Sequence, residues 1–176
     1  MIPASSPSPD ALPANALTLL HRLNEQRIEY VLIGELAAAV HGCPPSHQAV
    51  VIVPARFQRN LARLARALGA VGARGRGATT GGPALTANGL RALGHWRLDT
   101  DFGPLEIDFE PPATAGHLDL FENARRIAVG PDIEVEVASI ADLVRVAEMR
   151  RGPRDEALLP ALRQVLDAAS HPLSAQ

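Results

Sequence analysis

Apolar residues recur every three or four positions in several parts of the chain, which is the spacing of a helix with one buried face. The clearest such stripe is formed by Phe57, Leu61, Leu64 and Leu68. Asn15 and Ser139 are residue types that cap helix starts, and Asp142 completes a pattern like a capping box after Ser139. We therefore expect helices over residues 15–26, 35–40, 56–68, 139–151 and about 155–168.

Short apolar segments bounded by turn residues predict strands. They cover residues 29–33, 49–53, 96–100, 105–109, 126–129 and 133–137, of which the last four form two hairpins. The segment 49–53 is continuously apolar, which favours a central place in the sheet. Residues 72–82 read GARGRGATTGG and are interpreted as a loop, because no Gly-Lys-Ser/Thr follows the glycines. The order of elements predicts an α/β (α+β) fold with one mixed β-sheet flanked by helices.

Composition limits the domain organisation and the chemistry. The 176 residues suit one domain, expected over residues 15–170 after a disordered tail, rich in Pro, Ser and Ala, over residues 1–14. The net charge of −2 gives no whole-chain signal for nucleic acid or a membrane. All 17 basic residues are arginine, so any phosphate would be bound by guanidinium groups. The single cysteine, Cys43, excludes an internal disulfide, and the absence of a signal-peptide pattern favours a cytoplasmic protein.

Several motifs occur together in an order that carries a family resemblance. A strand ending in a glycine at residues 31–34 is followed by a short helix and the pair His41-Gly42. Later come Leu98-Asp99-Thr100-Asp101-Phe102-Gly103-Pro104-Leu105, the helix start at residues 137–143, and Arg154-Asp155. Over roughly residues 15–165 this combination resembles the nucleotidyltransferase-fold superfamily, and within it the small bacterial branch that includes abortive-infection toxin-like proteins. The resemblance implies a nucleotidyltransferase-like fold.

The chain departs from that family where the chemistry takes place. The family carries Asp-x-Asp on the second strand, and this chain has Ala49 and Val51 at those positions. Two residues two apart on a strand point to the same side, where aspartates would hold Mg²⁺ and methyl groups do not. The family's second glycine is replaced by Glu35, whose carboxylate would repel a phosphate at the helix start. The family's third carboxylate position is Glu106, which keeps its charge.

Other acidic residues are candidates to replace the missing ligands. Glu106 and Asp108 are two apart on one predicted strand and share a face, so with Glu35 they form a candidate catalytic set. The alternative is that they are ordinary strand acids. The resemblance places the remnant of the phosphate-binding side at Gly34, Glu35, His41 and Gly42.

Two further groups of residues have open interpretations. Arg56, Arg59, Arg63 and Arg66 lie on one face of the predicted helix 56–68, either to contact phosphates or as a solvated surface. His41 and His47 flank the turn that contains Cys43 and either share a site or bond to nearby backbone.

Three functional hypotheses follow. The first is a pseudoenzyme of this fold that has lost nucleotidyl transfer and acts as a binding or regulatory module for a partner protein, a nucleotide or RNA. The second is an active nucleotidyltransferase with a rearranged carboxylate set, Glu35, Glu106 and Asp108. Only this hypothesis requires Mg²⁺ and a nucleoside triphosphate, and under the others no cofactor is expected. The third is a nucleic-acid-binding module that uses the arginine face of residues 56–66.

Overall fold

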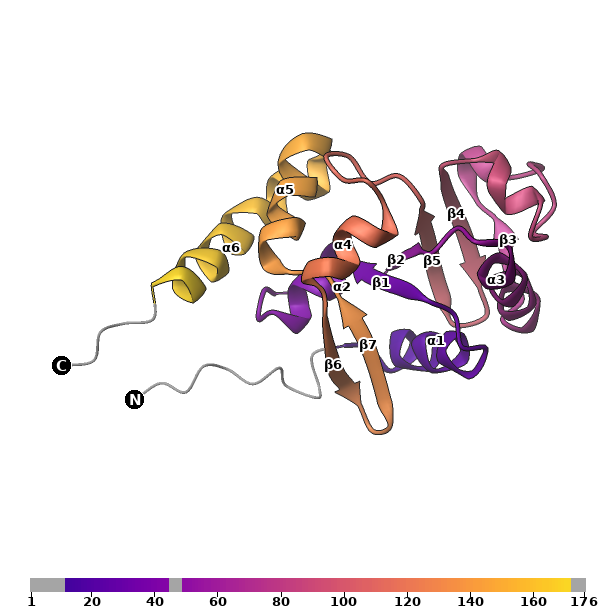
Figure 1. Ribbon diagram of the computed structural model, residues 1–176, viewed down its shortest axis with the longest axis horizontal. Coiled ribbons are helices and arrows are strands. Elements are labelled where there is room, and N and C mark those ends of the chain that lie inside the picture. Colours follow the sequence, from indigo (N-terminus) through magenta and orange to yellow (C-terminus); the bar gives the residue numbers. More distant parts are fainter. Residues whose placement is uncertain (1–11, 45–48, 172–176) are drawn as a thin grey trace.

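The computed structural model describes residues 12–44 and 49–171, and in that part of the chain six α helices surround one seven-stranded mixed sheet (Figure 1). The strands are β1 (Tyr30–Ile33), β2 (Val50–Pro54), β3 (Arg74–Gly75), β4 (His95–Thr100), β5 (Gly103–Asp108), β6 (Arg125–Gly130) and β7 (Ile133–Val137). The helices are α1 (Ala14–Glu25), α2 (Gly34–Val40), α3 (Gln58–Ala70), α4 (His117–Asn123), α5 (Ile140–Arg150) and α6 (Pro153–Ser170). The expected α/β class with one mixed sheet is confirmed.

The strand order β3-β4-β5-β2-β1-β7-β6 combines local hairpins with long-range pairing. The β4–β5 and β6–β7 pairs are antiparallel hairpins, as the sequence predicts. β2 lies antiparallel to β1 and parallel to β5, and β1 lies parallel to β7. Every residue of β1 and β2 is buried, so the central position predicted for the second strand is confirmed.

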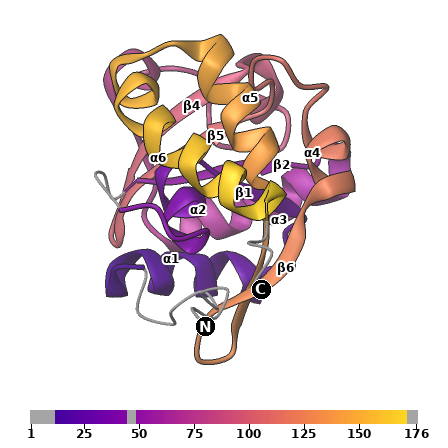
Figure 2. The same ribbon diagram turned by 90° about the vertical axis from the view of Figure 1, so that its left-hand side faces the viewer.

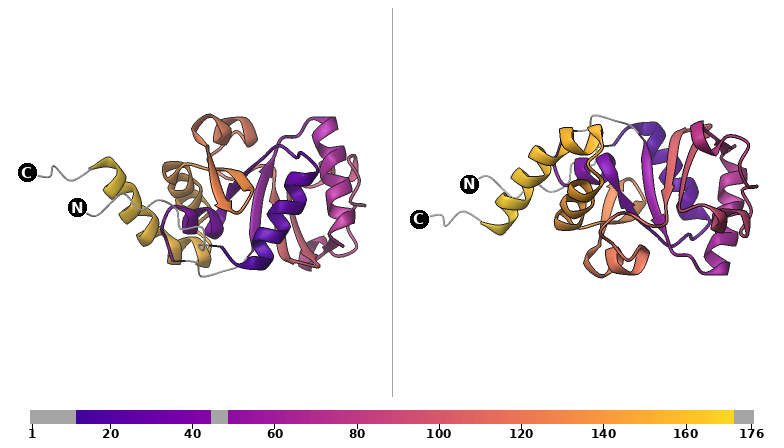
Figure 3. Two further views of the ribbon diagram at one scale, coloured as in Figure 1. Left: turned by 90° about the horizontal axis from the view of Figure 1, so that it is seen from below. Right: turned by 90° about the horizontal axis from the view of Figure 1, so that it is seen from above.

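The helices pack against different parts of the sheet and against one another. α1 packs against β2, β5 and β7, whereas α2 lies between β1 and α5. α5 and α6 pack against each other, and α6 projects from one end of the molecule while α3 lies near the other end (Figures 1 and 3). Viewed from the side in Figure 2, α5 and α6 lie in front of the sheet. None of the described helices combines the length and the apolar character needed to cross a membrane.

The buried apolar residues form one core cluster that extends from Leu12 to Leu162. Leu61, Leu64 and Leu68 are fully buried, as their spacing predicts. Phe57 departs from that prediction: it precedes the helix, which begins at Gln58, and 45% of its surface is exposed. The side chain of Ser139 caps α5 by accepting the Asp142 N–H at 3.1 Å, which confirms the predicted cap.

The structure corrects several boundaries. The residue before α1 is Pro13, and Asn15 lies inside the helix with no capping bond. Leu12 is buried in the core, so packing begins before residue 15; the rest of the expected tail, residues 1–11, lies outside the described residues. The expected loop 72–82 contains the short edge strand β3 and a 3₁₀ turn, Gly77–Thr79. Helix α4 and the 3₁₀ turn Gly89–Ala92 are elements that the sequence pattern did not predict.

Candidate functional site

Charged side chains gather on one face of the β4–β5 hairpin. Along β4, His95, Arg97 and Asp99 are exposed and alternate with buried residues, because successive side chains of a strand point to opposite faces. The hairpin register places Arg97 opposite Glu106 and His95 opposite Asp108. Both predicted strand acids therefore share a face with basic residues from the neighbouring strand.

The junction between α5 and α6 adds two arginines to this face. Arg150 ends α5 and Arg154 lies in the first turn of α6. Together with the hairpin residues they line a cleft of about 460 Å³. Arg76, which follows β3, reaches the carboxylates of Asp99 and Glu106 from the edge of the sheet. We call this the basic cleft; its ionisable lining residues are His95, Arg97, Arg150 and Arg154 together with the acids Glu106, Asp108 and Asp155.

Glu106 is buried and lies among two guanidinium groups and an imidazole ring. Its carboxylate oxygens are 3.4 Å from His95 Nε2, 3.6 Å from an Arg154 nitrogen and 3.8 Å from an Arg76 nitrogen. The contact with His95 is the main cause that lowers the pKa of Glu106, and it outweighs the burial that acts in the opposite direction. Glu106 is therefore ionised at neutral pH, and its charge is balanced by the surrounding side chains.

Asp108 is also buried, and both of its oxygens already accept hydrogen bonds. Oδ1 accepts the Glu110 backbone N–H at 3.1 Å, and Oδ2 accepts an N–H of Arg150 at 2.8 Å. Burial nevertheless raises the pKa of Asp108, because desolvation outweighs the attraction of Arg150. Both carboxylate oxygens of Asp108 are thus engaged by groups of the protein, which leaves this acid poorly placed to bind a ligand.

These residues do not fit a Mg²⁺ site. In the parallel β2–β5 pair Val51 is the register partner of Glu106, so an aliphatic side chain lies where a second carboxylate would be needed. Within residues 12–44 and 49–171, no three His, Cys, Asp or Glu side chains come close enough together to hold a metal ion. Mg²⁺ prefers several oxygen ligands, and the guanidinium groups around Glu106 and Asp108 would repel it.

None of the residues expected on the phosphate-binding side lines the basic cleft. Gly34 starts α2 with a φ of +76°, and a Cβ there would lie 3.1 Å from Val51 Cγ2, so a side chain would be strained. Glu35 follows, with Oε2 buried and without a hydrogen-bond partner among the described residues. His41 Nε2 lies 2.8 Å from the Ala138 carbonyl oxygen, which ties the end of α2 to the end of β7, while Gly42 is exposed. His47 lies outside the described residues.

The arginine face predicted for residues 56–66 is divided. Arg56 precedes α3, pairs with Glu110 at 2.7 Å, and lies over the Phe109 ring, 5.0 Å from its centroid. Arg63 donates to the Arg27 carbonyl oxygen at 3.0 Å. Only Arg59 and Arg66 of the four form no ion pair or side-chain hydrogen bond with the described part of the chain. A nucleic-acid role for this face stays a prediction.

Cys43 is buried, and burial raises the pKa of its thiol, which disfavours the reactive thiolate.

His95, Arg97 and Arg150 are cleft residues that the sequence interpretation missed. A signal for the first two was present in the alternation of HWRLDT, whose polar face lies across the hairpin from Glu106 and Asp108.

No family model matches this chain, and no curated protein matches it. The resemblance to nucleotidyltransferases therefore depends on the motifs within the chain. Its function has to be argued from the chemistry of the basic cleft.

Proposed function

We propose that this chain is a nucleotidyltransferase-like protein without transfer activity, and that it binds the phosphate groups of a nucleotide or RNA in the basic cleft without a metal ion. The observation that carries the proposal is the environment of Glu106. This acid keeps the position of the family's third carboxylate, yet it is surrounded by Arg76, His95 and Arg154 and stands beside Val51.

The loss of transfer follows from the requirements of the reaction. Nucleotidyl transfer depends on metal ions that position the triphosphate and stabilise the entering and leaving oxygens. Ala49 and Val51 offer no ligand oxygens, and the two nearby acids are already paired with guanidinium groups. Mg²⁺ would have to displace arginines that cannot lose their charge.

Binding of an anion fits the same side chains. Arg97 is exposed and forms no ion pair with any described residue, although it faces the cleft. Arg154 pairs with Glu106 through one nitrogen at 3.6 Å, but its side chain is 56% exposed, so its other donors can reach a second acceptor. Planar guanidinium groups bind phosphate oxygens in pairs, which makes Arg97 and Arg154 the expected contacts.

The proposal is tested by thermal unfolding with each nucleoside triphosphate and with a short RNA, in the presence and absence of Mg²⁺. We expect a rise in Tm that does not need the metal, because a ligand at about 100 times its Kd stabilises a folded protein by about 2.7 kcal/mol. The double variant Arg97→Ala/Arg154→Ala should lose this rise. Arg125→Ala is the matched control, since Arg125 is exposed on β6 and lies outside the cleft.

A transfer assay tests whether the protein is an active nucleotidyltransferase instead. The proposal would be overturned if the protein incorporated a labelled nucleotide into any acceptor, if that incorporation required Mg²⁺, and if Glu106→Ala abolished it. It would favour the rearranged carboxylate set of Glu35, Glu106 and Asp108. Nucleic-acid binding that persists in Arg97→Ala/Arg154→Ala but is lost when Arg59 and Arg63 are both replaced by alanine would instead favour the α3 face.

A further inference from the structure

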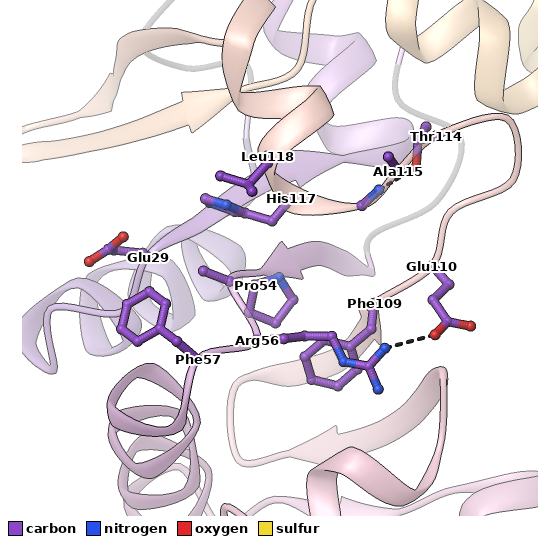
Figure 4. Close-up of a pocket in the computed structure, with 12 residues that line it drawn as sticks. Glu29, Pro54, Arg56, Phe57, Phe109, Glu110, Thr114, Ala115, His117 and Leu118 are labelled. Carbon is purple, nitrogen blue, oxygen red and sulfur yellow. Dashed lines mark hydrogen bonds and ion pairs between the residues drawn. The ribbon is translucent and has the colours of Figure 1, made fainter.

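A second cleft lies at the carboxyl ends of the two parallel strands β2 and β5. Its volume is about 570 Å³, within the range of small-molecule sites, and it shares no lining residue with the basic cleft. It is bounded by the loop from β2 to α3 and by the loop from β5 to α4 (Figure 4). In open α/β sheets, ligands bind outside the carboxyl ends of the strands, so this position favours a binding site.

The walls of this second cleft, which we call the apolar cleft, are largely apolar. Pro54 and Phe57 line one side, and His117 and Leu118 line the other (Figure 4). Phe57 and Leu118 are 45% and 76% exposed, although large apolar side chains are usually buried. The His117 ring stacks on Phe121 at a centroid distance of 5.5 Å, which supports the orientation of the ring.

The two ends of the cleft differ in charge. At one end Arg56 lies over Phe109 and pairs with Glu110 at 2.7 Å, so these two charges balance each other. At the other end no described residue forms an ion pair or a hydrogen bond with the Glu29 carboxylate. Figure 4 shows the Phe57 and His117 rings on the side of the cleft where Glu29 lies, with the Glu29 carboxylate directed outward, away from Pro54 and Arg56.

Glu29 is held in place by its backbone. The buried Asn60 accepts the Glu29 N–H at 2.8 Å and donates to the Glu29 carbonyl oxygen at 2.9 Å. His117 Nδ1 is buried and has no hydrogen-bond partner among the described residues. Burial also lowers the pKa of His117, which favours the neutral ring at neutral pH. This end of the cleft therefore presents a negative charge, an aromatic face and a ring without a competing positive charge.

We propose that the apolar cleft binds a small organic cation with a flat apolar body, whose ammonium or amidinium head lies between the Glu29 carboxylate and the Phe57 ring. The head donates a charge-assisted hydrogen bond to the carboxylate and makes a cation–π interaction with the ring. The flat body is buried between Pro54 and Leu118, which removes apolar surface from water.

Benzamidine and benzamide provide the test, because they have nearly the same shape and differ in charge. Both compounds are titrated into the full chain up to about 10 mM, because ligands of this size are expected to bind weakly. The amide signals of Ala55, Phe57 and His117 are followed by NMR. We expect benzamidine to shift these signals and to bind more tightly than benzamide. Glu29→Gln should weaken benzamidine binding about tenfold, since a hydrogen bond to a charged acceptor becomes a neutral one.

Glu122→Gln is the matched control, because Glu122 is exposed on α4 and does not line the cleft. Its benzamidine affinity should equal that of the unmodified chain. Equal binding of benzamidine and benzamide, unchanged binding in Glu29→Gln, or no shift of the cleft signals would each overturn the proposal. Because the Glu29 side chain is exposed, Glu29→Gln should have the same Tm as the unmodified chain. An unchanged Tm shows that a loss of binding is not caused by a loss of folding.

Discussion

Asn60 joins three parts of the chain through one buried amide. Its Nδ2 donates to the Glu29 and Ala55 carbonyl oxygens at 2.9 and 2.8 Å, and its Oδ1 accepts the Glu29 N–H at 2.8 Å. The start of β1 and the end of β2 are thereby tied to the first turn of α3. Asn60→Ala would remove all three bonds.

The cost follows from the groups left without partners. The Glu29 carbonyl still accepts the Ala55 N–H at 3.0 Å, but the Glu29 N–H and the Ala55 carbonyl lose the only partners that the structure gives them within the described chain. At about 1–3 kcal/mol for each unsatisfied buried group, we expect a loss of about 3 kcal/mol in the free energy of unfolding. For a chain of this length that corresponds to a fall in Tm of about 6–12 °C.

Urea unfolding followed by the fluorescence of the buried Trp96 measures this loss. Asn60→Asp keeps the acceptor and nearly the same volume but turns a carboxylate oxygen toward two carbonyl oxygens, so it should be at least as destabilising as Asn60→Ala. Asn88→Ala is the control: Asn88 is exposed, its side chain forms no capping bond, and the change should stay within about 0.5 kcal/mol. A cost below about 1 kcal/mol for Asn60→Ala, or a fully stable Asn60→Asp, would refute the reasoning.

Further single substitutions test the roles of five side chains, with Arg163 as the comparison for Arg150. Because the folded-state pKa of Glu106 is lowered, its contribution to stability is present above its unfolded pKa and lost at lower pH, so the Tm difference between the unmodified chain and Glu106→Gln should shrink from about pH 6 to about pH 3. The pKa of Asp108 is raised, so the unmodified chain should lose stability relative to Asp108→Asn as the pH rises through about 4. In urea unfolding, Arg150→Ala should cost about 2 kcal/mol, less than for a fully buried pair because 35% of the Arg150 side chain is exposed. Arg163→Ala breaks an exposed pair of the same 2.8 Å length and should cost less than about 0.5 kcal/mol; equal losses for both arginines would contradict the role of burial. Ser139→Ala should cost about 1 kcal/mol in the same assay, with Ser139→Asp restoring most of it, and a neutral Ser139→Ala would show that the cap is dispensable.

Local patterns were sufficient to predict the elements that bury a regular stripe or join in hairpins. The leucines of α3 and the alternation across β4 and β5 are examples, because the periods of a helix and a strand differ. Helix α4 was missed because its sequence, HLDLFEN, buries only Leu120 and leaves Leu118 and Phe121 exposed. The strand β3 was missed because it has two residues and lies in a glycine-rich segment.

The candidate site was harder to predict than the elements. The pairing of Glu106 and Asp108 on one face follows from their spacing on β5. Their arginine partners do not follow, because Arg76 comes from the edge of the sheet and Arg154 from α6, and only the tertiary packing brings them together. A helix that begins at Arg56 predicts a core position for Phe57. The helix begins two residues later, and the ring instead lines the apolar cleft.

The pairing of β1 with β7 has a consequence for the order in which the chain is made. Leu32 is the register partner of Val137, so the two strands leave the ribosome about 5–20 s apart at ordinary rates of synthesis. β2, β4 and β5 can pair with one another and with β1 during that interval, while the other edge of β1 stays open. All four residues of β1 are buried in the finished protein, so a nascent chain carries an apolar, unpaired strand edge until its last strand arrives.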